Sequence, residues 1–278
     1  VRAIDRFFFG KGLIESNDNL ELIIEDSRML NVDVFKDVDF VIDLVAVSND
    51  PSGELYQKAT WEINHESRVR TAKLSKEMGV RRYVLPSSCS IYGFQDKDVV
   101  CSEEHEINPL TNYAKANRAA ERDILRLADD NFTVVVLRQS TVYGYSPRMR
   151  FDLAINGMTF GAWKNGTLPL MRDGEQWRPM LHVKDAADAQ IFMLDYKISR
   201  EINAQIYNVG SNKDTFQIGS LAKLIADTIP KNVQIEWYGD PDHRSYRVSF
   251  DKIESLGWMT KQSVKEACLE IYHKLDHA

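Results

Sequence analysis

Short apolar runs alternate along the chain with longer segments whose apolar positions recur at the period of a helix. Short runs of this kind are typical of buried strands, and the longer segments are typical of helices. Because connecting helices return the chain to the same sheet, the alternation predicts β-α-β units on a parallel sheet. The predicted strands cover residues 1–5, 20–25, 40–47, 82–85, 133–138 and 205–209, and the predicted helices cover residues 61–78 and 113–128.

The regular alternation stops after residue 142, where glycines, prolines and aromatic residues are frequent as far as residue 177. Such residues interrupt helices and strands, so a second, smaller lobe is expected to begin there. The remainder of the chain predicts helices over residues 183–196, 218–228 and 264–275, and a strand over residues 234–238. The expected fold class is α/β, with a doubly wound parallel sheet and a smaller α/β lobe.

Composition narrows the range of functions. A chain of 278 residues, 44% of them hydrophobic, can bury one large core, or one core and a smaller lobe. A net charge of -6 and an isoelectric point near 5.6 provide no broad basic surface, which argues against nucleic acid or acidic lipid as the partner. An anionic substrate would need arginines placed locally in its site.

Cysteine usage and hydropathy indicate the compartment. Cys89, Cys101 and Cys268 lie far apart in the sequence, which indicates neither a disulfide framework nor a metal site. No stretch reaches the ~18 consecutive apolar residues of a membrane span, and the first residues do not resemble a signal peptide. The protein is expected to be soluble and cytoplasmic, with no metal and no membrane partner.

The first predicted strand ends at Asp5. In a dinucleotide-binding fold a carboxylate at this place bonds the adenosine ribose and repels a 2'-phosphate, so Asp5 favours NAD over NADP. A turn or capping residue is the alternative. The glycine-rich phosphate turn should come about 20 residues earlier, yet Gly10 and Gly12 come later. A further strand, glycine turn and helix are therefore expected upstream in the natural protein.

Two segments carry the strongest chemical signal. Residues 87–93 read Ser-Ser-Cys-Ser-Ile-Tyr-Gly and place Ser88 after a predicted strand, at the sheet edge where α/β folds bind ligands. Residues 108–115 read Asn-Pro-Leu-Thr-Asn-Tyr-Ala-Lys and place Tyr113 at the start of a helix. Together they resemble the Ser…Tyr-x-x-x-Lys site of the extended short-chain dehydrogenases/reductases.

Further segments resemble this family in the same order along the chain, as far as about residue 258. They are residues 41–46, Asn64, and residues 137–144, 176–185, 207–210 and 242–246. The chain is similar to the NAD-dependent nucleotide-sugar epimerases and dehydratases, and among them to members like the UDP-glucose/galactose 4-epimerases. The resemblance implies a Rossmann-type NAD-binding domain over residues 1–141 and 178–210, and a substrate-binding lobe over residues 142–177 and 211–278. It also implies a homodimer paired through the helices at 61–78 and 113–128.

The resemblance also implies roles for single residues. Tyr113 would take a proton from a sugar hydroxyl and Ser88 would donate a hydrogen bond to the sugar oxygen, while hydride passes to NAD. The implied cofactor-binding residues are Asp5, Asp26, Leu44, Ala46, Asn64 and Tyr113, and the implied substrate-binding residues are Ser90, Thr141, Arg178 and Arg244. The implied substrate is a nucleotide-diphosphate sugar, whose phosphates suit the two arginines.

Some of these roles have alternatives. Asp26 could cap the turn that follows it instead of bonding the adenine amine. Arg178 and Arg244 could form surface salt bridges, and the same choice applies to Arg148 and Arg150.

One position departs from the family. The lysine expected four residues after Tyr113 is replaced by Asn117, and Lys115 faces roughly the opposite side of the helix. A tyrosine with the ordinary pKa of about 10 needs a nearby positive charge to act as a base at neutral pH. Losing that charge at about 5 to 6 Å costs about 3 kcal/mol, or about 2 pKa units. The sequence predicts weakened catalysis, although Asn117 could still bond a ribose hydroxyl.

The residues after Ser88 help to choose the reaction. Family members that remove water place an Asp-Glu pair there, where this chain has Cys89 and Ser90. Epimerisation or simple oxidoreduction is therefore favoured over dehydration. Two other interpretations stay open: an NAD(P)-dependent reductase of a non-nucleotide carbonyl compound, and a catalytically weak NAD-binding protein.

Overall fold

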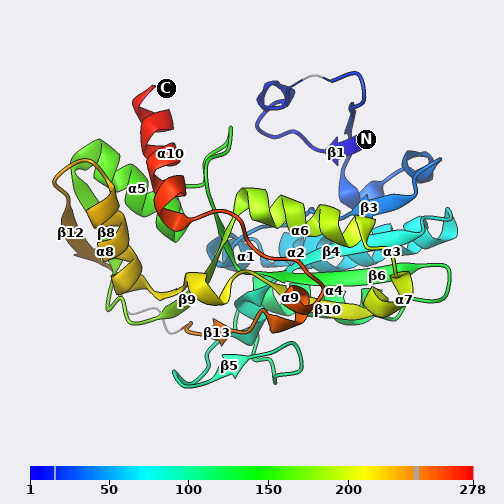
Figure 1. Cartoon of the computed structure of the whole chain (residues 1–278). Helices are drawn as coiled ribbons and strands as arrows, with labels where there is room; N and C mark the ends of the chain where they lie inside the picture. Colours follow the sequence, from blue (N-terminus) through cyan, green and yellow to red (C-terminus); the bar gives the residue numbers. More distant parts are fainter. Residues whose placement is uncertain (16, 241–243, 278) are drawn as a thin grey trace. The chain divides into compact units, whose positions relative to one another are not determined.

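The computed structural model describes residues 1–15, 17–240 and 244–277, and it is an α/β protein (Figure 1). The chain folds into two compact units. The first unit contains Val1–Ile91, Pro109–Leu137 and Phe192–Ile206, and the second contains Tyr92–Asn108, Arg138–Ile191 and Tyr207–Ala278. The predicted limits of an NAD-binding domain and a substrate-binding lobe remain a prediction.

The first unit is built on parallel strands. Its strands are β1 (Arg2–Asp5), β2 (Glu21–Ile24), β3 (Phe40–Ile42), β4 (Arg82–Ser88) and the larger part of β6 (Thr133–Gln139), and β10 (Gln205–Val209) begins in it. Its helices are α1 (Asp50–Leu55), α2 (Gln57–Trp61), the π-helical η4 (Glu62–Ser67), α3 (Arg68–Glu77), α4 (Asn112–Leu125) and α7 (Ser199–Ile202). Short 3₁₀ turns are η1 (Lys11–Leu13), η2 (Ser27–Met29), η3 (Val32–Phe35) and η5 (Cys89–Tyr92).

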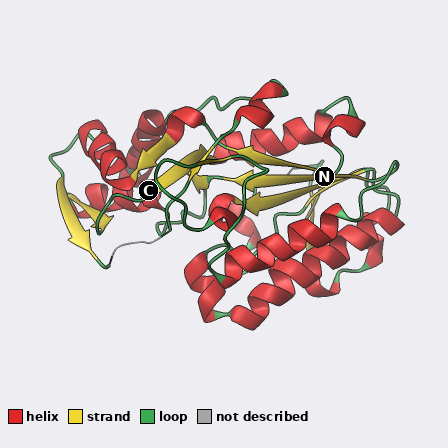
Figure 2. Ribbon diagram, turned by 90° about the horizontal axis from the view of Figure 1, so that it is seen from below, coloured by secondary structure: helices red, strands yellow, loops and turns green. Residues whose placement is uncertain are grey.

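Hydrogen bonding orders four of these strands as β10-β6-β4-β3, and β1 pairs with β2 in a separate parallel pair. In Figure 2 the strands form a layer beside the helices. Strands β3 and β4 run parallel, with Val41 opposite Tyr83. Alternate residues of β4 and β6 pack with Ala72 of α3 and Ala120 of α4 in one buried apolar cluster. This packing follows from the two-residue period of a strand and the apolar stripe of each helix.

The second unit contains smaller sheets. Its strands are β5 (Val100–Cys101), β7 (Thr141–Tyr143), β8 (Thr167–Met171), β9 (Trp177–His182), β11 (Thr215–Gln217), β12 (Gln234–Tyr238) and β13 (Arg247–Val248). Its helices are α5 (Ala154–Asn165), α8 (Ile218–Thr228), α9 (Asp251–Ser255), α10 (Val264–Asp276) and the greater part of α6 (Val183–Asp195), and η6 (Asn212–Asp214) is a 3₁₀ turn. β9 pairs with β7 in parallel and with β11 in antiparallel, and α5, α8 and α10 share a core with β8.

One predicted strand is too long. The apolar run at residues 40–47 leaves the sheet after Ile42, because side chains from elsewhere bind the backbone that follows. The guanidinium of Arg68 donates from Nε to the carbonyl of Val45 at 2.7 Å and from Nη2 to the carbonyl of Asp43 at 3.4 Å. These carbonyls therefore need no neighbouring strand.

Within the described ranges, no helix is both long and apolar enough to cross a bilayer, and no group of three or more acidic, histidine or cysteine side chains could hold a metal ion.

Candidate active site

Ser88 and Tyr113 both lie in the first unit, at the ends of two adjacent elements. Ser88 is the last residue of β4, and Tyr113 is the second residue of α4. The hydroxyl of Ser88 contributes hydrogen bonding that lowers the pKa of Tyr113, so the structure brings the two side chains together. Both are half-buried. The pair predicted from the sequence is therefore present as a unit at the carboxyl end of β4.

The start of α4 is held in place by α1. Thr111 caps the helix by accepting a hydrogen bond from the backbone of Ala114 at 3.2 Å, as N-cap threonines do. The carboxylate of Glu54 accepts hydrogen bonds from the backbone and the side chain of Asn112, at 2.7 and 2.8 Å. At Gly53 an added Cβ would lie 3.0 Å from the Cβ of Tyr113, so this close approach favours a glycine. These contacts fix the position of the Tyr113 backbone.

A polar face of α4 lies over the end of β4. Tyr113, Asn117 and Glu121 follow at intervals of four residues, which places them on one face of the helix. Glu121 is fully buried and accepts a hydrogen bond from Ser87 at 2.6 Å. This contact ties the strand residue next to Ser88 to the helix that carries Tyr113.

The environment of Tyr113 contains opposing influences on its acidity. Burial raises the pKa of the phenol above 10.0, and this is the largest effect. The positive charge of Arg68 and the hydroxyl of Ser88 lower the pKa, whereas the negative charge of Asp50 raises it. The phenol therefore needs every nearby positive charge if it is to accept a proton at neutral pH.

Asn117 is buried, and its two amide atoms differ. Its Oδ1 accepts a hydrogen bond from Nη1 of Arg68 at 2.9 Å. Its Nδ2 is buried and has no hydrogen-bond partner in the part of the chain that the structure describes. Lys115 is exposed, which agrees with the prediction that it faces away from Tyr113.

Arg68 is a member of this site that the sequence analysis missed. It is the first residue of α3, and only 3% of its surface is exposed. The available signal was its position four residues after Asn64 in a predicted helix, because residues at that spacing share a face. Arg68 therefore lies on the same buried face as Asn64.

Asn64 and the residues after β3 form the edge next to this site. Asn64 is fully buried, and its side chain accepts from the backbone nitrogen of Val47 at 2.7 Å and donates to its carbonyl at 3.0 Å. Leu44 is 64% exposed and Ala46 is half-buried, both in the same loop. Asn64 therefore shapes the loop, and cofactor contacts of these three residues remain predictions.

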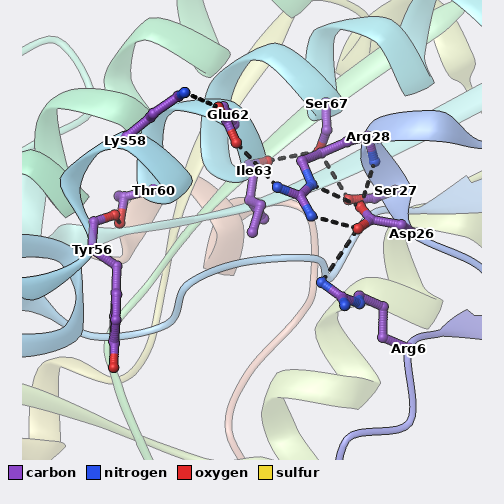
Figure 3. Close-up of polar contacts among 10 residues, drawn as sticks. All are labelled: Arg6, Asp26, Ser27, Arg28, Tyr56, Lys58, Thr60, Glu62, Ile63 and Ser67. Carbon is purple, nitrogen blue, oxygen red and sulfur yellow. Dashed lines mark hydrogen bonds and ion pairs between the residues drawn. The ribbon is translucent and has the colours of Figure 1, made fainter.

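Asp26 belongs to an ion-pair network with Arg28, Arg6 and Glu62 (Figure 3). Its carboxylate accepts from the backbone of Arg28 at 3.0 Å and pairs with the guanidinium at 2.6 Å, which caps the η2 turn. The Arg28 guanidinium lowers the pKa of Asp26 from 3.8 to about 2. The capping alternative is thus what the structure shows, and contact with adenine stays a prediction.

Asp5 is exposed, and its carboxylate accepts a hydrogen bond from the backbone nitrogen of Phe7 at 2.6 Å.

The predicted substrate arginines lie together in the second unit. Arg178, in β9, donates from Nη1 to the carbonyl of Trp177 at 2.8 Å and also to the carbonyl of Arg244. Its guanidinium stacks 5.2 Å from the ring centre of Tyr246. Asp242 and His243, which precede Arg244 in the predicted motif, lie outside the described residues.

The other predicted substrate residues have mixed surroundings. Thr141 begins β7 and is half-buried. Ser90 has a buried hydroxyl without a hydrogen-bond partner in the described part of the chain. Arg150 pairs with Asp152 at 2.6 Å, which agrees with a surface ion pair, and Arg148 is exposed.

Comparison with known proteins identifies the family. A profile of the "NAD dependent epimerase/dehydratase family" matches residues 11–210. A relative from Methanocaldococcus jannaschii, called "Putative UDP-glucose 4-epimerase", is 26% identical over 262 residues, which cover 90% of this chain and 82% of the relative.

Solved structures share the fold. A UDP-N-acetylglucosamine 4-epimerase from Methanobrevibacter ruminantium M1, in complex with UDP-N-acetylmuramic acid, has a TM-score of 0.88 at 19% identity. A UDP-glucuronic acid 4-epimerase from Bacillus cereus, in complex with UDP-glucuronic acid and NAD, has a TM-score of 0.87 at 19% identity. Each match covers 99% of this chain and 90% of the other. The predicted Rossmann-type α/β fold is confirmed, and because the profile spans more than half of the sequence, the chain belongs to the NAD-dependent epimerase/dehydratase family.

Proposed function

We propose that this protein epimerises or oxidises a nucleotide-diphosphate sugar by transient hydride transfer, with Tyr113 as the base and Ser88 as the hydrogen-bond donor to the reacting oxygen. The observation that carries the proposal is the pairing of these two side chains at the carboxyl end of β4. In open α/β sheets, ligands bind at this edge. The similarity to sugar epimerases supports the choice of substrate class.

NAD is the cofactor of the family, and residues of the first unit fit it. The Nδ2 of Asn117 is a buried donor without a partner among the described residues, and it suits a ribose hydroxyl. Leu44 exposes 64% of its surface just beyond β3 and offers an apolar contact for a planar ring. When bound, NAD would supply the acceptor, and later the donor, of the hydride.

The chain's own residues would handle the proton. Tyr113, as a phenolate, takes the proton of the sugar hydroxyl while the carbon loses hydride, and it gives the proton back when hydride returns. Ser88 donates a hydrogen bond to the same oxygen, which stabilises it as its bond order to carbon changes. Arg178 and Arg244 are proposed as the ligands of the diphosphate, since guanidinium groups match phosphate oxygens.

Epimerisation is favoured over dehydration because Cys89 and Ser90 follow Ser88. Cys89 is fully buried, and neither side chain is a carboxylate that could act as the acid or base of an elimination.

The test is turnover on a panel of UDP-sugars, with products separated by chromatography and NADH formation followed by absorbance. Wild-type protein is expected to convert at least one sugar into its epimer, and Tyr113→Phe to lose roughly 10²- to 10⁴-fold in kcat. Tyr56→Phe, which alters an exposed phenol, is the matched control. Full activity of the Tyr113→Phe variant would overturn the proposal.

Assembly is a separate proposal. Pairing of two copies through η4–α3 and α4 follows from the family resemblance, and light scattering of the purified protein tests it. A single species with the mass of two 31.9-kDa chains is expected.

A further inference from the structure

The side chain of Arg68 is a buried cation, and all of its hydrogen-bond acceptors are neutral groups. It is 3% exposed and donates to two backbone carbonyls, those of Val45 and Asp43, and to the side chain of Asn117. It forms no ion pair with any carboxylate of the described chain. Burial of an unpaired charge is costly, and a neutral amide could satisfy similar acceptors at a lower cost. A role for the positive charge itself is therefore indicated.

The position of Arg68 connects it with Tyr113. Its Nη1 donates to Oδ1 of Asn117 at 2.9 Å, and Asn117 lies one helical turn after Tyr113 on the same face of α4. Its Nε and Nη2 donate to the carbonyls of Val45 and Asp43. All three nitrogens of the guanidinium are therefore held, and the position of the charge is fixed. Among the interactions that lower the pKa of Tyr113, the one with Arg68 is the largest.

We propose that Arg68, held in place by Asn117, supplies the positive charge that allows Tyr113 to act as a base. The arginine and the asparagine together would then replace the single lysine expected at position 117. This inference rests on the proposed role of Tyr113, and it reverses the expectation that Asn117 leaves the phenol without a cation. Arg68 is a positioning residue, because it acts through the charge that it places near the phenol.

Other charged groups near Tyr113 are engaged elsewhere or act against it. Asp50 of α1 is the one that opposes Arg68 by raising the pKa of Tyr113. The remaining acidic side chains of the packed elements have partners of their own: Glu54 with Asn112, Glu62 with Arg28, Asp123 with His65, Glu121 with Ser87 and Arg118, and Asp43 with Tyr83. Glu66 of η4 is exposed, and so is Lys115 on α4. Within the described chain, Arg68 is thus the cation that acts on this phenol.

Removal of the charge is the direct test. In Arg68→Gln the limb of the kcat/KM profile on which activity rises with pH, which follows deprotonation of the base, should shift to higher pH by about one to two units. Activity at pH 7 should therefore fall about 10- to 100-fold. The double variant Arg68→Gln with Asn117→Lys returns a cation to the helix of Tyr113. It should restore most of the activity at pH 7 and most of the original pH profile. Arg68→Met serves as the neutral variant if the glutamine variant does not fold. Arg70→Gln on the same helix is the matched control, since Arg70 donates to the carbonyl of Leu30 and should leave the profile unchanged.

A second readout does not depend on turnover. Protein labelled at Cζ of its 11 tyrosines can be titrated by NMR, with the Tyr113 signal assigned through Tyr113→Phe. The Tyr113 signal should titrate at higher pH in the neutral Arg68 variant, and an unchanged titration would overturn the inference even in an active enzyme. If the titration shifts but no UDP-sugar is converted by wild-type protein, the electrostatic link stands and the proposed function fails. A loss of activity without any shift in titration or profile would assign Arg68 a structural role only.

Discussion

The side chain of Asn64 holds the backbone of Val47 through both of its amide atoms, at 2.7 and 3.0 Å. Asn64 lies on η4 and Val47 in the loop after β3, so this contact fixes the loop at the edge of the candidate site. Asn64→Asp would remove the donor and leave the half-buried carbonyl of Val47 without its hydrogen bond. A loss of about 1 to 3 kcal/mol in the free energy of unfolding is expected. Urea denaturation measures it, and Asn131→Asp at an exposed position is the control for the same chemical change.

Ser87 and Ser88 are neighbours with different expected roles. Ser88→Ala should lower kcat about 10²- to 10³-fold, because a donor to the reacting oxygen is lost, while the free energy of unfolding changes little. Ser87→Ala should instead lower stability by about 1 to 3 kcal/mol, since buried Glu121 loses its hydrogen bond from Ser87. Steady-state kinetics and denaturation of the two variants are compared directly. Equal effects of both substitutions on kcat would contradict the assignment of Ser88.

Arg244 distinguishes a nucleotide sugar from a smaller carbonyl substrate. If it binds the diphosphate, Arg244→Ala should weaken the affinity for UDP by tenfold or more, because a charge-assisted hydrogen bond is lost. Calorimetric titration with UDP gives the affinity. Arg150→Ala, which breaks an ion pair with Asp152, should leave UDP binding unchanged. Unaltered affinity in Arg244→Ala would instead favour a reductase of a non-nucleotide compound.

Asp26 should make stability depend on pH in the acid range. Its pKa is lowered from 3.8 to about 2 in the folded protein, so its contribution is fully present above the unfolded value and disappears as the pH falls toward about 2. After allowance for solvent screening, Asp26→Asn should cost about 1 to 2 kcal/mol at pH 6 and almost nothing near pH 2. Denaturation of both proteins across this range measures the difference. Asp39→Asn, which breaks an exposed pair with Arg81, should have a small effect throughout.

Much of the fold was predictable because periodicity in the sequence reflects local packing. Strand β12 and helix α8 have the predicted bounds, Gln234–Tyr238 and Ile218–Thr228. The strand predicted at 40–47 ends at Ile42 because Arg68 and Asn64 bind the backbone that follows. An apolar run does not reveal whether its carbonyls are satisfied by a strand or by distant side chains.

The candidate site was predictable where residue types carry the chemistry, as with Ser88 and Tyr113. Asn117 stood out as a missing charge, but the arginine that contacts it is 49 positions away in the sequence. A positive charge missing from one helix can be supplied by a residue on any element that the fold brings near. The pattern within that helix does not reveal such a residue.

The contact between Arg68 and Asn117 constrains how such a site can be altered stepwise. Introducing lysine at 117 alone would set two cations against each other in a buried space, and removing arginine at 68 alone would leave none. Either single change is expected to be worse than the starting protein or the double variant, so the two positions should show sign epistasis, and an engineer or a mutating lineage would have to exchange them together.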